Sequence, residues 1–356
     1  MARLPGIRRC LLRTCGVAAI ASIVLATAPG SSAGLTDGVR LRRISYVAHN
    51  GYVRPAYVLL PAWYGPDRNP PLPVVISPHG RGGDGRSNSR FWRDLPAIGD
   101  FAVLSPDGMG RRYTRYSYGY PGQIDDLARM PELAARALPW LRIDRSRIYA
   151  LGTSMGGQET LLLVSRHPRL LAGAVAMDSV TDLARRYRQL PGVPCNEACV
   201  ERYGKPYGRV LQATLRREVG GTPAERPEAY AARSASSRAV RIAASGVPLQ
   251  IWWSSGDQIV FDQEHQSAAL VRELGRLGTC APLVEYAGTW RHSQAMWAGS
   301  LLPLALAGFG LLPRGFPGIA DGDYRGACVP TAGLPEIPRL YATGLECRSV
   351  SGMGCT

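Results

Sequence analysis

The sequence predicts an α/β protein with a mostly parallel sheet and helices on both of its faces. Short apolar runs, typical of buried strands, alternate with helical patterns from residue 74 to residue 306, and this alternation indicates a parallel sheet. The central stretch, Arg147–Gly157, reads RIYALGTSMGG: an apolar run, glycines around Ser154, and then helix-forming residues. With 356 residues, 46% of them apolar, the chain suffices for one large α/β domain or two smaller ones.

The first 33 residues have the pattern of a secretory signal peptide. Four arginines precede an apolar run from Val17 to Ala28, and small residues lead to an expected cleavage site near Ala33. The apolar run is too short to span a bilayer as an ordinary helix. The segment around Arg8-Arg9 fits the twin-arginine export route and the general route equally. We therefore expect an extracellular protein with no membrane segment once the signal is removed.

Export to an oxidising compartment would allow the cysteines to form disulfides. Cys195 and Cys199 are close enough in sequence to pair locally, and an even number of cysteines in an oxidising compartment indicates disulfides. A metal site is the alternative, but no histidine stands at ligand spacing from a cysteine pair, so we expect neither a metal nor another cofactor. Six cysteines remain after signal cleavage: Cys195, Cys199, Cys280, Cys328, Cys347 and Cys355.

The chain is strongly basic through its arginines. The formal charge is +15, or +11 without the four arginines of the signal, and Lys205 is the only lysine. A basic exported protein can favour anionic cell-wall polymers or acidic substrates. The sequence shows no basic stripe with interleaved aromatic residues, which argues against a nucleic-acid partner.

The elements before Ser154 begin with a hairpin. Two β-rich runs in residues 35–60 flank Asn50-Gly51, a turn-forming pair. Strands are expected at residues 74–77 and 101–104, and an amphipathic helix at residues 123–138.

After Ser154 the chain departs from simple alternation. A helix at residues 157–167 and a strand at 171–177 lead into residues 180–245, which lack strand-like runs and are interpreted as a helical insertion, or lid. We place the main domain at residues 34–310 and a Gly-, Pro- and Cys-rich tail, packed on that domain, at 311–356. Between the insertion and the tail, the pattern predicts a strand at 248–255, a helix at 263–277, a strand at 282–287 and a helix at 293–306.

A serine at a strand-to-helix turn suits nucleophilic catalysis, provided that a base and an acid support it. In this architecture the acid and then the histidine follow the serine in the chain. His292 lies in the loop after the last strand, where it can serve as base, and Asp257 stands at the end of the preceding strand as the acid. Asp178 is an alternative acid, whereas Asp262 fits better as a helix N-cap.

The other histidines fit less well. His49 and His79 precede the serine, His167 lies at the far end of the following helix, and His265 falls inside an expected helix.

Acyl transfer also needs two N–H donors for the developing oxyanion. The backbone N–H of Met155, directly after the serine, is expected to be one donor. The other is assigned to Arg81, with Gly80 as the next choice, in the glycine-rich loop that follows the strand at residues 74–77.

These motifs resemble the α/β-hydrolase superfamily, most closely the catalytic domain of the prolyl oligopeptidase family and related secreted esterases. The resemblance rests on HGRGG after a strand, RIYALGTSMGGQET, GDQIV and the late His292, and it covers about residues 70–310. It implies a serine hydrolase with Ser154, Asp257 and His292 as nucleophile, acid and base. The insertion and the tail are not part of the family's common core.

Aromatic residues near the strand ends are candidates for substrate contacts. The loop with Tyr113, Tyr116, Tyr118 and Tyr120 follows a strand end, where ligands bind in such sheets. These rings could equally pack beneath the lid. Trp290 stands two residues before His292 and could form a wall of the pocket.

The sequence thus predicts a serine hydrolase that cleaves an ester or a peptide bond through an acyl-enzyme on Ser154. The motifs do not distinguish esters from peptides, because both reactions use the same groups. Two alternatives remain: a non-catalytic protein of the same fold that binds cell-wall polymer, and an acyltransferase that replaces water by another acceptor.

Overall fold

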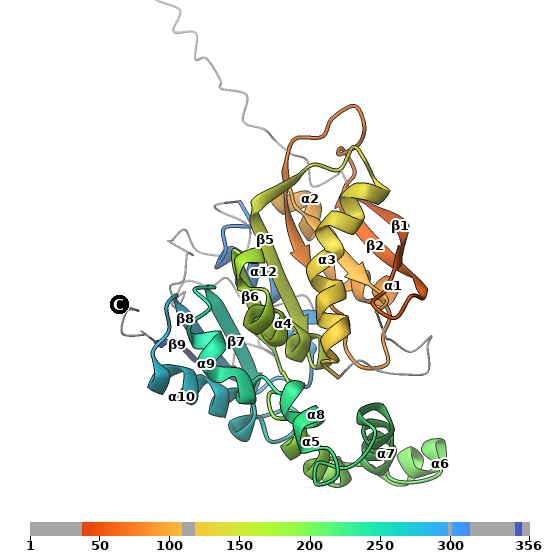
Figure 1. Cartoon of the computed structure of the whole chain (residues 1–356), viewed down its shortest axis with the longest axis vertical. Coiled ribbons are helices and arrows are strands. Elements are labelled where there is room, and N and C mark those ends of the chain that lie inside the picture. The colour runs from red at the N-terminus through yellow and green to blue at the C-terminus, as the bar shows by residue number, and fades with distance from the viewer. Residues whose placement is uncertain (1–37, 109–117, 298–300, 314–345, 351–356) are drawn as a thin grey trace, which may run out of the picture. The chain divides into compact units, whose positions relative to one another are not determined.

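The computed structural model describes residues 38–108, 118–297, 301–313 and 346–350, which form a nine-stranded sheet with the strand order β1-β2-β4-β3-β5-β6-β7-β8-β9 (Figure 1). Strands β4, β3, β5, β6, β7 and β8 are parallel to one another, while β1, β2 and β9 pair antiparallel at the two edges. The strands are β1 Val39–Val47, β2 Val53–Pro61, β3 Leu72–Ile76, β4 Ala102–Pro106, β5 Ile143–Thr153, β6 Gly173–Met177, β7 Leu249–Ser254, β8 Leu283–Gly288 and β9 Glu346–Val350.

Helices cover both faces of the sheet because alternate residues of each strand point to opposite sides. In β5, Ile148 and Ala150 pack into one apolar core, and Tyr149 and Leu151 pack into another. The first core lies under α3 (Pro121–Ala137), α4 (Met155–Arg166), α9 (Ala239–Ala243) and α10 (Ser267–Leu277). The second lies under α2 (Leu95–Gly99), α11 (Gln294–Trp297) and α12 (Leu302–Ala307).

The insertion after β6 is helical, in agreement with its lack of strand-like runs. Helices α5 (Leu183–Gln189), α6 (Glu197–Tyr203), α7 (Tyr207–Val219) and α8 (Pro227–Ala232) gather below the carboxyl ends of the strands in Figure 1. We call these four helices the lid. They have a small apolar core of their own, which extends to Met155 of α4 and to Val180 and Val260 in the loops after β6 and β7. The last helix of residues 180–245 is different, because α9 packs on the sheet face.

The strand and helix expectations agree with the structure in most places, and two differ. The helix expected over residues 293–306 is two helices, α11 and α12, and Pro303 lies in the first turn of α12, a position that proline favours because it needs no N–H partner. The tail contains a strand that the sequence pattern did not indicate: β9 pairs with β8 through Glu346–Val350. The rest of the tail and residues 1–37 lie outside the described part of the chain.

The cysteine prediction is tested at one pair. Cys195 and Cys199 form a disulfide at the beginning of α6. Cys280 is disulfide-bonded as well. Cys328 and Cys355, and the side chain of Cys347, lie outside what the structure describes.

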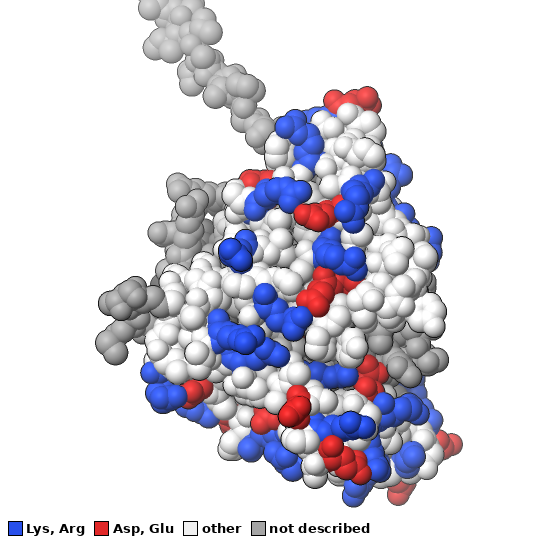
Figure 2. All heavy atoms as spheres, in the orientation of Figure 1, with Lys and Arg blue, Asp and Glu red and all other residues white. Residues whose placement is uncertain are grey.

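The surface carries arginines over much of the face in Figure 2, with acidic side chains scattered between them. No single-sign stripe is visible on that face, so binding to an anionic polymer remains a prediction. Within the described residues, none of the helices combines the length and the apolar character needed to cross a bilayer.

Candidate active site

Ser154 lies at the sharp turn between β5 and α4. Its backbone has φ 60° and ψ −123°, a strained conformation for a residue other than glycine. The turn is tight: a Cβ on Gly152 would lie 2.5 Å from the Gly156 carbonyl, and one on Gly156 would lie 2.3 Å from the oxygen of Pro78. Glycines at both positions therefore allow the turn to place the Ser154 side chain at the carboxyl end of the sheet.

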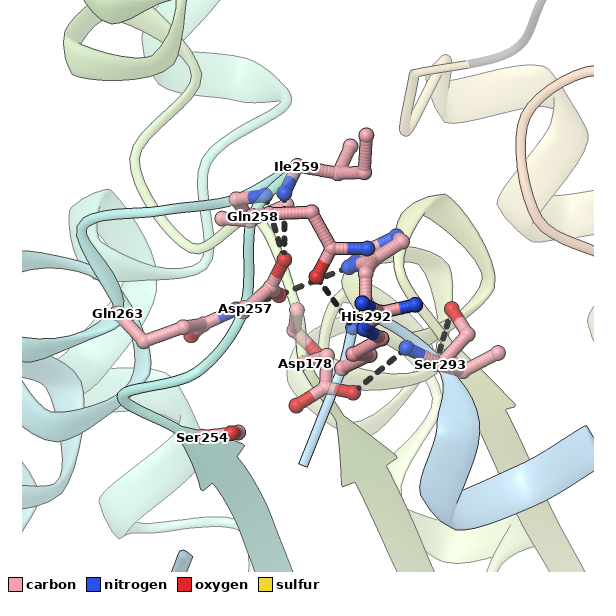
Figure 3. Close-up of polar contacts among 12 residues, drawn as sticks. Asp178, Ser254, Asp257, Gln258, Ile259, Gln263, His292 and Ser293 are labelled. Atoms are coloured by element: carbon pink, nitrogen blue, oxygen red, sulfur yellow. Dashed lines mark hydrogen bonds and ion pairs between the residues drawn. The ribbon is translucent and has the colours of Figure 1, made fainter. Parts of the chain in front are cut away.

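His292 and Asp257 are joined by a hydrogen bond (Figure 3). Nδ1 of His292 lies 2.8 Å from Oδ2 of Asp257. Both come from loops at strand ends, Asp257 after β7 and His292 after β8. This contact orients the ring and leaves its Nε2 atom available for a proton from a nucleophile.

Asp257 is held as a carboxylate. The residue is 2% exposed, and its Oδ1 accepts hydrogen bonds from the N–H groups of Ile259 and Val260, both at 2.8 Å. Burial opposes ionisation, but the hydrogen bonds from His292 and from these backbone groups outweigh it and lower the pKa of Asp257 below its usual value. An ionised Asp257 is the form that accepts a hydrogen bond from the Nδ1–H group of His292.

A second carboxyl group, Asp178, lies beside this pair. It follows β6, is fully buried, and accepts hydrogen bonds from Trp290 Nε1 at 3.0 Å and from the Ser293 N–H at 2.9 Å. One oxygen of each carboxyl group and one ring nitrogen of His292 lie within 4.8 Å of one another. Burial, together with the neighbouring charge of Asp257, raises the pKa of Asp178 to about 7. The pKa values of the two carboxyl groups are therefore shifted in opposite directions. Asp257, not Asp178, forms the hydrogen bond to the imidazole.

The serine turn and the histidine loop are linked by their neighbours in sequence. Thr153 Oγ1 donates a hydrogen bond to Ser293 Oγ at 3.0 Å, which ties the residue before Ser154 to the residue after His292. Among the described residues, no hydrogen bond joins the Ser154 hydroxyl to His292 itself. Such contacts are often long without substrate and shorten when it binds.

The glycine-rich loop after β3 reaches the serine turn. A Cβ on Gly80 would lie 3.8 Å from Cβ of Ser154, so the backbone of Gly80 passes next to the nucleophile candidate. His79 fixes this loop, because its ring nitrogens lie 2.8 Å from the carbonyl oxygens of Gly80 and Asp107. The loop that carries Arg81 thus lies next to Ser154, and Met155 directly follows Ser154 in the chain. That their N–H groups are the oxyanion donors stays a prediction.

A pocket of about 180 Å³ lies between the lid and the strand ends. It is called the lid pocket below. Its apolar wall consists of Met155, Val180, Leu190, Leu211, Ile259 and Val260. Its polar lining consists of Arg81, Tyr118, Arg186, Tyr207 and His292.

The aromatic residues predicted to contact the substrate lie in different parts of the structure. Tyr118 lines the lid pocket, whereas Tyr120 packs against His49, with ring centroids 5.3 Å apart, and beneath the guanidinium of Arg233. Trp290 is 4% exposed and belongs to the core behind the histidine loop, where it donates to Asp178, so it supports the site rather than forming a pocket wall. Tyr113 and Tyr116 lie outside the described residues.

The remaining histidines contact other groups. His49 pairs with Asp126, His167 with Asp125 and His265 with Asp262. Asp262 occupies the N-cap position of the 3₁₀ turn Gln263–His265, as the sequence suggested, but its carboxylate pairs with Arg185 and His265 and makes no capping hydrogen bond.

Arg186 is the pocket residue that sequence reasoning missed. It is one of several arginines in the insertion, and nothing in the local sequence marks it as buried.

A comparison of the sequence with protein families finds one match at this region. The model of the prolyl oligopeptidase family matches residues 107–289, which is about half of the chain. The chain belongs to the prolyl oligopeptidase family. Membership in this family indicates a serine hydrolase, and its fold is that of the α/β-hydrolases.

Solved structures of peptidases and esterases share the fold. The acylaminoacyl peptidase of Pyrococcus horikoshii has a TM-score of 0.58 and 16% identity, and the match covers 79% of this chain and 43% of that one. S-formylglutathione hydrolase of Staphylococcus aureus has a TM-score of 0.55 and 16% identity, with 77% and 99% covered. A thermostable esterase of Pseudomonas putida has a TM-score of 0.54 and 18% identity, with 77% and 81% covered. The chain spans only 33% to 43% of the length of the peptidases that it matches.

Proposed function

We propose that the protein is a secreted serine hydrolase that cleaves carboxylic ester or peptide bonds through an acyl-enzyme on Ser154. The observation that carries the proposal is the hydrogen-bonded pair of Asp257 and His292. The hydrogen bond between Thr153 and Ser293 ties the histidine loop to the strained strand-to-helix turn that carries Ser154. Family membership supports the same reaction class.

The reaction follows from the roles that these groups can take. Nε2 of His292 accepts the proton of the Ser154 hydroxyl as Oγ attacks the carbonyl carbon of the substrate. The oxyanion that forms is stabilised by the N–H groups of Met155 and of Arg81 or Gly80. His292 then gives the proton to the leaving alcohol or amine. Water, activated by the same ring, hydrolyses the acyl-enzyme and frees Ser154.

The size of the lid pocket favours a small substrate group. Its volume of 180 Å³ is below the roughly 300 to 1,000 Å³ that is usual for small-molecule sites, and most of its wall is apolar. This space accommodates a short acyl group rather than a long peptide segment.

The nucleophile assignment is tested by Ser154→Ala. Turnover of a 4-nitrophenyl ester should fall by roughly 10⁶-fold, since the acyl-enzyme cannot form. Ser146→Ala removes an exposed serine hydroxyl on β5 and should leave turnover unchanged. A fluorophosphonate probe should label the wild type at Ser154, with loss of fluoride, and should not label the variant. Retained hydrolysis by Ser154→Ala would refute the proposal.

The bond type and the route out of the cell need separate measurements. A panel of nitrophenyl esters, feruloyl esters and proline-containing amides would rank ester against peptide hydrolysis. Product analysis with an added acceptor would detect acyl transfer. Export by a signal at residues 1–33 would yield a mature protein that begins near Gly34, which N-terminal sequencing of protein from the culture medium would detect.

A further inference from the structure

Arg186 is a buried cation that has no ion-pair partner among the described residues. It belongs to α5 of the lid and is 4% exposed. Its side chain lines the lid pocket together with His292. Within the described part of the chain, its Nη1 atom is buried and has no hydrogen-bond partner, and the guanidinium forms no ion pair.

Neighbouring arginines do have acidic partners. Arg185, the preceding residue, pairs with Asp262 at 3.0 Å, and the buried Arg233 of the same insertion lies 3.9 Å from Glu218. Burial lowers the pKa of Arg186 to about 10, so the side chain is still charged at neutral pH. A buried charge without a partner is strongly unfavourable. The fold tolerates this cost at Arg186, which faces the pocket.

The described residues that line the lid pocket carry positive charge and no negative charge. Among the described residues that line it, Arg81 and Arg186 are cations and none is a carboxylate. Arg81 donates to the hydroxyl of Tyr207 at 3.1 Å and also interacts with Tyr118. The carboxylate of Asp257 attracts Arg186 from outside the pocket but is hydrogen-bonded to His292.

We propose that the lid pocket binds a carboxylate of the substrate and that Arg186 is the residue that selects it. The inference rests on the proposed function, because it concerns the substrate of the same site. A carboxylate matches the two-donor geometry of a guanidinium and neutralises its charge. Because the pocket has a volume of only about 180 Å³ and both Arg186 and His292 line it, the carboxylate is separated from the scissile carbonyl by only a few carbon atoms.

The carboxylate could belong to the acyl group or to the leaving group, and matched substrates distinguish the two. The acyl pair is the 4-nitrophenyl monoester of glutaric acid and the corresponding ester of glutaramic acid, which carries an uncharged amide instead. The leaving-group pair is the butyryl ester of glycolic acid and that of glycolamide. Rates are corrected for spontaneous hydrolysis.

Arg186→Met removes the charge and keeps an unbranched side chain. We expect kcat/KM for the carboxylate member of one pair to fall by about 10- to 100-fold, the effect of losing a hydrogen bond to a charged group. The uncharged member should change little. Arg188→Met, an exposed arginine on the same helix, should alter neither substrate. Arg186→Gln is the second variant, should the methionine variant fail to fold.

Binding without turnover gives an independent readout. Calorimetry with glutarate and with butyryl glycolate on the Ser154→Ala protein should show binding of at least one of them, and the added Arg186→Met change should abolish it. Equal rates on both members of each pair in the wild type, or equal loss on both in Arg186→Met, would overturn the inference. Neither result depends on the outcome of the Ser154→Ala activity test, which judges the proposed function alone.

Discussion

The two aspartates beside His292 lie close together but have different pKa values, lowered for Asp257 and raised for Asp178. Asp257 receives two backbone N–H groups and the imidazole, and these donors favour the carboxylate. Among the described residues, Asp178 accepts hydrogen bonds only from Trp290 and Ser293, and the negative charge of Asp257 opposes its ionisation. Hydrogen-bond donors, rather than burial, therefore decide which acid serves the histidine, because both groups are buried.

The raised pKa of Asp178 makes stability depend on pH. In the unfolded chain this group loses its proton near pH 3.8, but in the folded protein only near pH 7. Between these values the folded state binds more protons, so the free energy of unfolding should fall as pH rises, by up to about 1.4 kcal/mol per pH unit.

Asp178→Asn should flatten this slope, because the amide cannot ionise and its oxygen can still accept the Ser293 N–H. Urea unfolding between pH 4 and pH 7 measures it. Asp67→Asn, at an exposed carboxyl group, should leave the slope unchanged. A variant of Asp178 with the slope of the wild type would contradict the assigned pKa.

At the scale of elements, the turn between β5 and α4 depends on its contact with the loop after β3. An alanine at position 156 would improve helix propensity by about 1 kcal/mol. Its Cβ would, however, lie 2.3 Å from the carbonyl oxygen of Pro78, so either the loop or the turn must move.

Gly156→Ala should therefore lower kcat/KM by about 10²-fold, the effect of a displacement near 1 Å at a reacting group. Gly38→Ala adds a methyl group with no heavy atom within 4 Å and should leave activity unchanged. Ester hydrolysis and a crystal structure of the variant check the result. Wild-type activity in Gly156→Ala would show that the loop adjusts at no cost.

Much of this arrangement could be predicted from the sequence because it follows from local patterns. The periodicity of apolar residues predicts the strands, and chain order selects Asp257 and His292 as partners for Ser154, which the structure brings to one edge of the sheet. Strand β9 was missed because its pairing with β8 is a contact between distant segments. Arg186 was missed for a similar reason: its burial depends on lid helices and strand ends that only the folded chain brings together.

The described residues contain four apolar cores: one on one face of the sheet, two on the other face and one within the lid. Leu162 of α4 lies in a sheet core and Leu215 of α7 lies in the lid core, and both are 0% exposed. A buried Leu→Ala change costs about 2 to 5 kcal/mol. A Leu→Ala change should thus destabilise the part of the molecule whose core contains that leucine.

Leu162→Ala should lower the midpoint of global unfolding, whereas Leu215→Ala should mainly increase hydrogen exchange in residues 183–232. Mass spectrometry of peptides after exchange measures both. Equal loss of protection throughout the chain in the two variants would show that lid and sheet unfold as one unit.

The separate lid core also bears on how such a protein can diversify. The proposed reacting groups Ser154, Asp257 and His292 are anchored by the sheet and the turns at its edge, while the lid meets that edge through few apolar side chains. Mutations in α5 to α8 can accumulate, and new helices can replace old ones, without disturbing the bond-breaking machinery. Proteins that descend from one ancestral hydrolase can therefore change their substrate specificity through the lid and keep the same reaction chemistry.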